Sequence, residues 1–203
     1  MKKVLKLCLP FILIILFVLL FFCLRDIYVS LSSDHTVKTL DSIENYNYTL
    51  NENDSKYYKK IFQELKDNLE SKEINEEEYA VSVSKLFAVD FYSLEYAFSK
   101  SDVGGIQFVY DGYRDTFSLK AKDTVYAYVE SNVYGKRTQE LPNVTDVEVT
   151  NVEQKEYNGK TESDSKAYYI DLTLTYEKDL GYPTECSFVL IHHDNKLEIV
   201  EMK

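Results

Sequence analysis

Asp90 is the residue of this sequence with the strongest case for chemistry. It falls among apolar residues whose spacing of three and four places them on one helix face: Val83, Leu86, Phe87 and Leu94. A carboxylate that faces a core costs free energy unless it accepts hydrogen bonds, and burial raises its pKa toward the range of a general acid or base. Asp90 is therefore a candidate ligand-binding residue. The alternative is a structural carboxylate, either satisfied by a buried Tyr hydroxyl or placed at the edge of the apolar row.

His192, in the run His192-His193-Asp194, is the second candidate ligand-binding residue. Two histidines beside an aspartate suggest a metal ion, but neighbouring residues of a strand point to opposite faces of the sheet. The two imidazoles would then not share one ion, and we predict no metal site. We also name no catalytic residues, because no nucleophile elbow accompanies the three histidines of the chain.

The glycine pair Gly104-Gly105 comes closest to a cofactor-binding motif. Glycines let a backbone approach a phosphate closely, yet neither the P-loop pattern nor the dinucleotide-binding pattern surrounds this pair. We interpret residues 99–105 as a turn and predict no cofactor. Cys186 alternates with Phe188 and Leu190, as a small core residue would, so we expect it to be buried rather than reactive.

Two predicted helices precede the glycine pair. The first is capped by Asn53 or Asp54 and ends near Ser71, with one apolar stripe: Tyr58, Ile61, Phe62, Leu65 and Leu69. The second helix carries Asp90. It begins at Asn75, and Glu78 stands three residues later in the position of a capping box.

A short strand over residues 106–110 and a third helix over 113–131 are predicted next. In the strand, apolar and polar residues alternate, and Asp111 is placed to cap the helix. The side chains expected to face inward from this helix are Phe117, Ala121, Val125, Tyr128 and Val129.

Beyond Gly135 the apolar period changes from 3.6 to 2, which indicates strands. Four strands are predicted. The first begins at Val147, and the other three cover residues 168–176, 186–192 and 197–201, with polar turns between them. Both faces of 186–192 are apolar, so we expect this strand in the centre of the sheet, covered on both sides.

Helices followed by a meander of strands predict an α+β fold in which the helices pack on one face of a curved antiparallel sheet. This element order, over about residues 40 to 203, resembles the nuclear transport factor 2-like cone. Proteins in which one amino-terminal span carries such a domain outside the membrane include scaffold components of type IV secretion and conjugation machines. The resemblance lies in element order alone, so it assigns no functional residue in this chain.

The apolar run over residues 7–24 contains no charged residue and is long enough to cross a bilayer as a helix. Lys2, Lys3 and Lys6 precede it, which predicts a cytoplasmic amino terminus and an extracytoplasmic remainder, in a single-pass protein of the cell membrane. A secretory signal peptide is the alternative, because Ser30-Leu31-Ser32 resembles a cleavage site, although the run is longer than the usual apolar region of a signal peptide.

Three regions follow from these patterns. Residues 1–25 are predicted to be a cytoplasmic tip and transmembrane anchor, residues 26–53 a polar stalk, and residues 54–203 the extracytoplasmic α+β domain. Within the stalk, Tyr46, Tyr48 and Leu50 alternate with polar residues and hint at a short strand.

The charge balance bears on partners. The net charge is −11, and all 34 acidic residues follow residue 25, so we predict no nucleic-acid partner. Our leading hypothesis is a non-enzymatic interaction or scaffold domain, as a homo-oligomer or part of an envelope protein complex. The second is a small-ligand-binding or hydrolytic domain with a pocket between helices and sheet and with Asp90 near its base.

Overall fold

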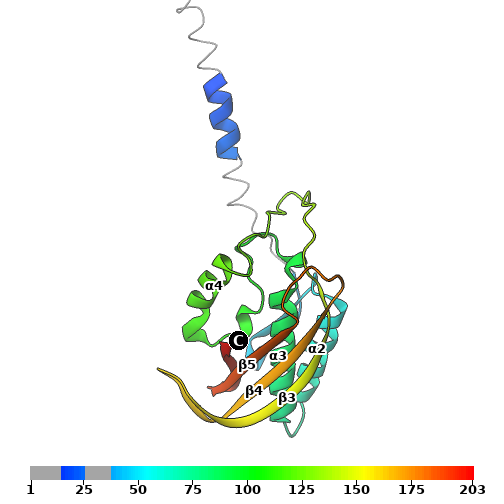
Figure 1. The fold of residues 1–203 in the computed structure, drawn as a ribbon, viewed down its shortest axis with the longest axis vertical. Coiled ribbons are helices and arrows are strands. Elements are labelled where there is room, and N and C mark those ends of the chain that lie inside the picture. The colour runs from blue at the N-terminus through cyan, green and yellow to red at the C-terminus, as the bar shows by residue number, and fades with distance from the viewer. Residues whose placement is uncertain (1–14, 26–37) are drawn as a thin grey trace, which may run out of the picture. The chain divides into compact units, whose positions relative to one another are not determined.

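The computed structural model describes residues 15–25 and 38–203, which belong to two separate compact units, Met1–Thr36 and Val37–Lys203 (Figure 1). In the first unit, residues 15–25 are helical. None of the helices in the described residues is long and apolar enough to cross a membrane. The first eight residues of the predicted span over 7–24 lie outside the described residues, so the anchor stays a prediction.

The second unit begins with a β-hairpin. Strand β1 (Thr39–Ile43) pairs antiparallel with β2 (Tyr48–Asn51) across the 3-10 helix η1 (Glu44–Tyr46). Tyr48 is fully buried, and its ring centroid lies 5.2 Å from that of Phe108. The predicted stalk over 26–53 is therefore wrong for residues 39–51, because the apolar side chains of the hairpin enter the core. Residues 26–37 of that prediction lie outside the described residues.

Helices α2 (Lys56–Leu69) and α3 (Glu76–Tyr92) follow. The whole apolar stripe predicted for the first helix is buried in α2, although its cap is Ser55, whose Oγ accepts the Tyr58 N–H at 3.0 Å. The Asn75 cap predicted for α3 is confirmed, since Asn75 Oδ1 accepts the Glu78 N–H at 3.3 Å. The second half of the predicted capping box is wrong, because the Asn75 N–H donates to Asn68 Oδ1 at 2.9 Å rather than to Glu78.

Short helical segments connect α3 to the sheet: η2 (Leu94–Tyr96), η3 (Ile106–Phe108), η4 (Asp111–Tyr113) and α4 (Arg114–Asp123). The predicted strand over 106–110 is wrong. Gly105, at φ 76°, begins a 3-10 turn there, and Val109 forms an isolated parallel bridge with Ile199. The predicted helix over 113–131 is wrong beyond Asp123. Its predicted inward residue Tyr128 is exposed, and Tyr126 is buried instead.

Four antiparallel strands complete the fold: β3 (Val144–Asn158), β4 (Ser163–Tyr176), β5 (Glu185–His193) and β6 (Lys196–Met202). They pair in chain order as a meander, and the β3–β4 pairing has three register shifts, two with the extra residue in β3 and one with it in β4. Figure 1 shows β3 and β4 curving strongly, with α3 crossing behind them. Bulges bend the bulged strand, which accounts for the curvature. The α+β class is confirmed.

Both faces of β5 are buried, as predicted. Cys186, Phe188 and Leu190 join the main core, whereas Val189 and Ile191 join a small cluster with Tyr157 and Ala167, so they do not face solvent. Burial raises the pKa of the Cys186 thiol to about 12, which agrees with a core residue rather than a nucleophile.

Candidate functional site

A hollow of about 660 Å³ lies between α4 and β6. Its apolar wall consists chiefly of Phe91, Val109, Phe117, Ala121 and Ile199. In Figure 1, α4 lies beside the carboxyl end of the chain, where β6 forms the opposite wall. The volume falls within the roughly 300–1,000 Å³ of small-molecule pockets and much of the wall is apolar, so this hollow is a candidate binding site.

The sequence of α4 explains why the hollow remains open. Phe117 reaches the core, where its ring centroid lies 5.3 Å from that of Phe91. Ala121, one turn later on the same face, is buried but is too short to fill the same depth. Thr116 and Lys120, which lie beside these two positions, line the rim and remain exposed.

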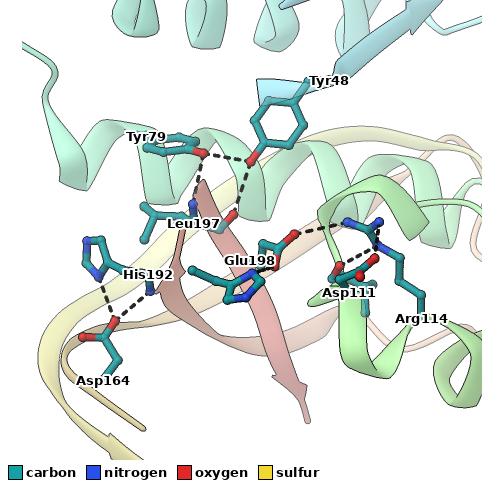
Figure 2. Close-up of polar contacts among 10 residues, drawn as sticks. Tyr48, Tyr79, Asp111, Arg114, Asp164, His192, Leu197 and Glu198 are labelled. Atoms are coloured by element: carbon teal, nitrogen blue, oxygen red, sulfur yellow. Dashed lines mark hydrogen bonds and ion pairs between the residues drawn. The ribbon is translucent and has the colours of Figure 1, made fainter. Parts of the chain in front are cut away.

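An ionic network fastens the start of α4 to β6 (Figure 2). The Arg114 guanidinium donates to Glu198 Oε1 at 3.1 Å, to Asp111 Oδ1 at 2.8 Å and to the Val109 carbonyl at 3.0 Å. The other Glu198 oxygen is 2.9 Å from His193 Nδ1. Glu198 is only 3 % exposed, and a buried carboxylate is tolerated because both of its oxygens have partners.

Tyr126 fastens the segment that follows α4. Its hydroxyl donates to the Phe91 carbonyl of α3 at 2.8 Å and accepts the Gly104 N–H at 3.0 Å. Burial raises the pKa of Tyr126, so the phenol stays neutral and keeps its proton for Phe91. The α4 segment is thus held at both ends across the hollow.

A tyrosine pair holds Leu197, the residue of β6 directly before Glu198. The Tyr48 and Tyr79 hydroxyls are 2.8 Å apart, and Figure 2 shows both directed at Leu197. Tyr79 accepts the Leu197 N–H at 3.0 Å, while Tyr48 donates to the Leu197 carbonyl at 3.2 Å. The β1–β2 hairpin, α3 and the start of β6 are therefore joined by one buried, uncharged network.

Asp90 lines a different hollow, of about 430 Å³, together with Asp54 and Asp102. Its Oδ2 accepts the Gly105 N–H at 2.7 Å, so its hydrogen-bond partner is a backbone amide and not the Tyr hydroxyl of one structural alternative. Burial raises the Asp90 pKa to about 6; the Gly105 hydrogen bond lowers it, and the charges of Asp54 and Asp102 raise it further.

The glycine pair has a structural reason to be there. A Cβ on Gly104 would collide with the backbone carbonyl of Asp90, and Gly105 adopts the left-handed φ of 76°. The predicted turn over 99–105 is confirmed. The pair permits a close approach to α3, which accounts for both glycines without a phosphate.

His192 is remote from Asp90. Its Nδ1 lies 2.7 Å from Asp164 Oδ2, and its Nε2 lies 3.8 Å from Glu76 Oε2. Glu76 begins α3 and Asp90 lies fourteen residues later, which separates the two positions by about 21 Å along the helix axis. The two predicted ligand-binding residues therefore do not form one site.

Asp164 is the partner that holds His192. Burial raises the Asp164 pKa, but hydrogen bonds from the His192 and Lys166 amides and from the His192 ring outweigh burial and lower it below the usual value. His193 turns instead to Glu198, so the two histidines have separate partners. Among the described residues, no group of three or more His, Cys, Asp or Glu side chains could hold a metal ion.

The sequence did not identify the α4–β6 hollow or the Glu198 network. One signal was available, because Glu198 lies between Leu197 and Ile199 in a short strand, where a carboxylate requires a partner. The partner, Arg114, lies 84 residues earlier, and nothing local in the sequence indicates the pairing.

Comparisons with protein-family models, with curated proteins and with solved structures found no match for this chain.

Proposed function

We propose that this chain is a single-pass protein of the cell membrane whose unit Val37–Lys203 is an extracytoplasmic binding domain, with the α4–β6 hollow as its binding site. The single observation that carries the binding assignment is the apolar hollow of about 660 Å³ between α4 and β6. An apolar surface left open to water costs free energy, and a bound molecule relieves that cost.

The membrane assignment rests on the uncharged run over residues 7–24 and on Lys2, Lys3 and Lys6 before it. The anchored protein would act in an interaction or scaffold role, as a homo-oligomer or in an envelope protein complex. The order of helices and strands in the α+β unit supports the resemblance to the nuclear transport factor 2-like cone.

Small-ligand binding is the second candidate, and the volume of the hollow favours it. Asp90 has no part in this form of the proposal, because it lines the other hollow. The sequence-based hypothesis also placed the pocket between helices and sheet, but with Asp90 near its base, whereas this hollow lies between α4 and β6.

Site-specific photo-crosslinking in intact cells tests the binding site. A photoreactive phenylalanine replaces Thr116, which lines the hollow, or Leu119, which is 63 % exposed on another face of α4 and serves as the matched control. We expect one reproducible adduct, identified by mass spectrometry, from position 116 and none from 119. Equal adducts from both positions, or none from either, would contradict the binding site.

Carbonate extraction of washed membranes tests the anchor. We expect the chain to remain in the membrane fraction with an intact amino terminus. Release into the supernatant, together with the mass of a mature chain that begins near Ser33, would show a cleaved signal peptide instead.

A further inference from the structure

The apolar part of the α4–β6 hollow suits a chain-like group. Its apolar lining comes from three elements: Phe117 and Ala121 of α4, Ile199 and Met202 of β6, and Phe91 of α3. These side chains offer no charge and no hydroxyl, so they would favour hydrocarbon over a polar molecule.

The rim of the hollow carries the polar groups. Lys203 is paired with Glu201 at 3.3 Å, so these two charges largely cancel. Within the part of the chain that the structure describes, the Lys120 ammonium has no ion-pair or hydrogen-bond partner. Among the charged side chains that line the hollow in the described residues, Lys120 is therefore the one without a partner, and it is positive on a chain whose net charge is −11.

Thr116 lies one turn before Lys120 on the same helix face and also lines the hollow. An ammonium and a hydroxyl one turn apart can both donate to the same anionic group. The apolar wall begins directly beside them, at Phe117 and Ala121.

We propose that the α4–β6 hollow binds a single-chain amphiphile with an anionic head group. Its aliphatic chain lies between α4 and β6, and its head group lies at Lys120 and Thr116. This inference rests on the proposed function, since it names the ligand class of the same site. A free fatty acid and a single-chain phospholipid share this chemistry, and competition between them identifies the source.

The test uses the full chain reconstituted in phosphatidylcholine vesicles. A C16 fatty acid with a diazirine near the end of its chain is photolysed with the vesicles, and the labelled peptides are identified by mass spectrometry. We expect saturable labelling in 114–123 and 196–203. Palmitate should compete, each methylene removed from the competitor should weaken competition about fourfold, and hexadecylamine should fail to compete. Whichever of palmitate and palmitoyl-lysophosphatidate competes at the lower concentration indicates the natural head group.

Four variants sharpen the test. Lys120→Glu should reduce labelling of these segments at least tenfold, because it replaces the attraction with repulsion. Ala121→Phe should abolish labelling by filling the hollow. If Ala121→Phe melts at a lower temperature than the parent, Thr116→Phe replaces it as the filling variant, because Thr116 is exposed. Leu119→Ala, whose side chain does not line the hollow, should label like the parent.

Two results would overturn the inference. Equal competition by palmitate and hexadecylamine would show that the head group is not recognised. Absence of labelling in 114–123 and 196–203, while position 116 still crosslinks to a protein in cells, would show that the hollow binds a protein segment. In that case the proposed function stands and the ligand class is wrong, whereas loss of both signals would refute the binding site itself.

Discussion

Helices α3 and α4 differ sharply in how the fold holds them. Ten of the 17 residues of α3 are buried, whereas of the ten described residues of α4 only Ala121 is buried. The core packs directly against α3, while α4 is fastened by polar contacts near its two ends, at Arg114 and Tyr126. A helix that is buried almost all round supports the fold, and a helix fastened at its ends can cover a hollow.

The largest expected effect comes from a core residue of α3. Phe87 is fully buried, and its ring centroid lies 5.0 Å from that of Phe188 and 5.3 Å from that of Phe91. Phe87→Ala should lower the free energy of unfolding by about 3–5 kcal/mol, because it removes buried surface and leaves a cavity. Urea unfolding measures the change. Leu119→Ala in α4 is the matched control and should stay within about 0.5 kcal/mol of the parent; comparable losses would mean that α4 is as much a part of the core as α3.

The next effect concerns the ion pair that holds α4. Glu198→Ala should lower the free energy of unfolding by about 1–3 kcal/mol, because the Arg114 guanidinium and the His193 ring lose the carboxylate between them. Hydrogen exchange should accelerate in α4 more than in α3. Uniform acceleration in both helices would show that Glu198 supports the whole unit rather than α4. Glu198→Gln keeps the shape and one hydrogen bond, so it should lie between the parent and the alanine variant.

Asp90 near the end of α3 should oppose stability at neutral pH. Its folded-state pKa of about 6 exceeds the ordinary value of 3.8, so between these pH values the folded state keeps a proton that the unfolded state has lost. The free energy of unfolding therefore falls, through this group, as pH rises from about 4 to 6, and the loss persists above pH 6. Asp90→Asn keeps an acceptor for Gly105 and should raise the free energy of unfolding at pH 7 by about 1–2 kcal/mol.

Thermal melting from pH 4 to 7 checks this prediction. The difference between Asp90→Asn and the parent should grow across that interval and then level off. A constant difference would mean that Asp90 does not titrate there. Asp102→Asn is a useful comparison, since it removes a neighbouring charge and should shift the midpoint of the Asp90 transition to lower pH.

The smallest effect concerns the helix caps. Asn75→Ala should lower the free energy of unfolding by about 1 kcal/mol, because the Glu78 N–H at the start of α3 loses its acceptor. Asn75→Asp restores an acceptor and should recover the parent stability. No side chain caps α4 in the described residues, where Tyr113 occupies the cap position. If Asn75→Ala has no effect, burial rather than capping sets the start of α3.

Patterns in the sequence identified α2, α3 and the four-strand meander, because each carries a local signal. The stripe of α2 recurs every three or four residues, and Asn75 stands directly before the acidic first turn of α3. Segments with weaker periodicity were misjudged. Residues 106–110 alternate like a strand, yet Gly105 turns the chain into η3, and the third helix stops at Asp123 although its apolar spacing continues.

The candidate site was harder to predict, because the partners of its side chains lie far away in the sequence. The sequence marks Asp90 as a carboxylate that needs a partner, either as a ligand-binding residue or as a structural one, but its partner is a backbone amide in a turn 15 residues later. His192 was singled out beside His193, and the structure gives each a different carboxylate. Side-chain type indicates that a partner is needed, whereas the identity of the partner depends on distant parts of the chain.

The sequence by itself determined the helices α2 and α3, the antiparallel meander, the buried state of Cys186 and the acidity of the chain. Each of these depends on residue type and on spacing within a few turns or strands. Only the tertiary structure decided that the β1–β2 hairpin joins the core, that Glu198 meets Arg114, and that a hollow remains between α4 and β6. Those features arise where side chains far apart in the chain meet, and their energies depend on packing and burial that no local pattern encodes.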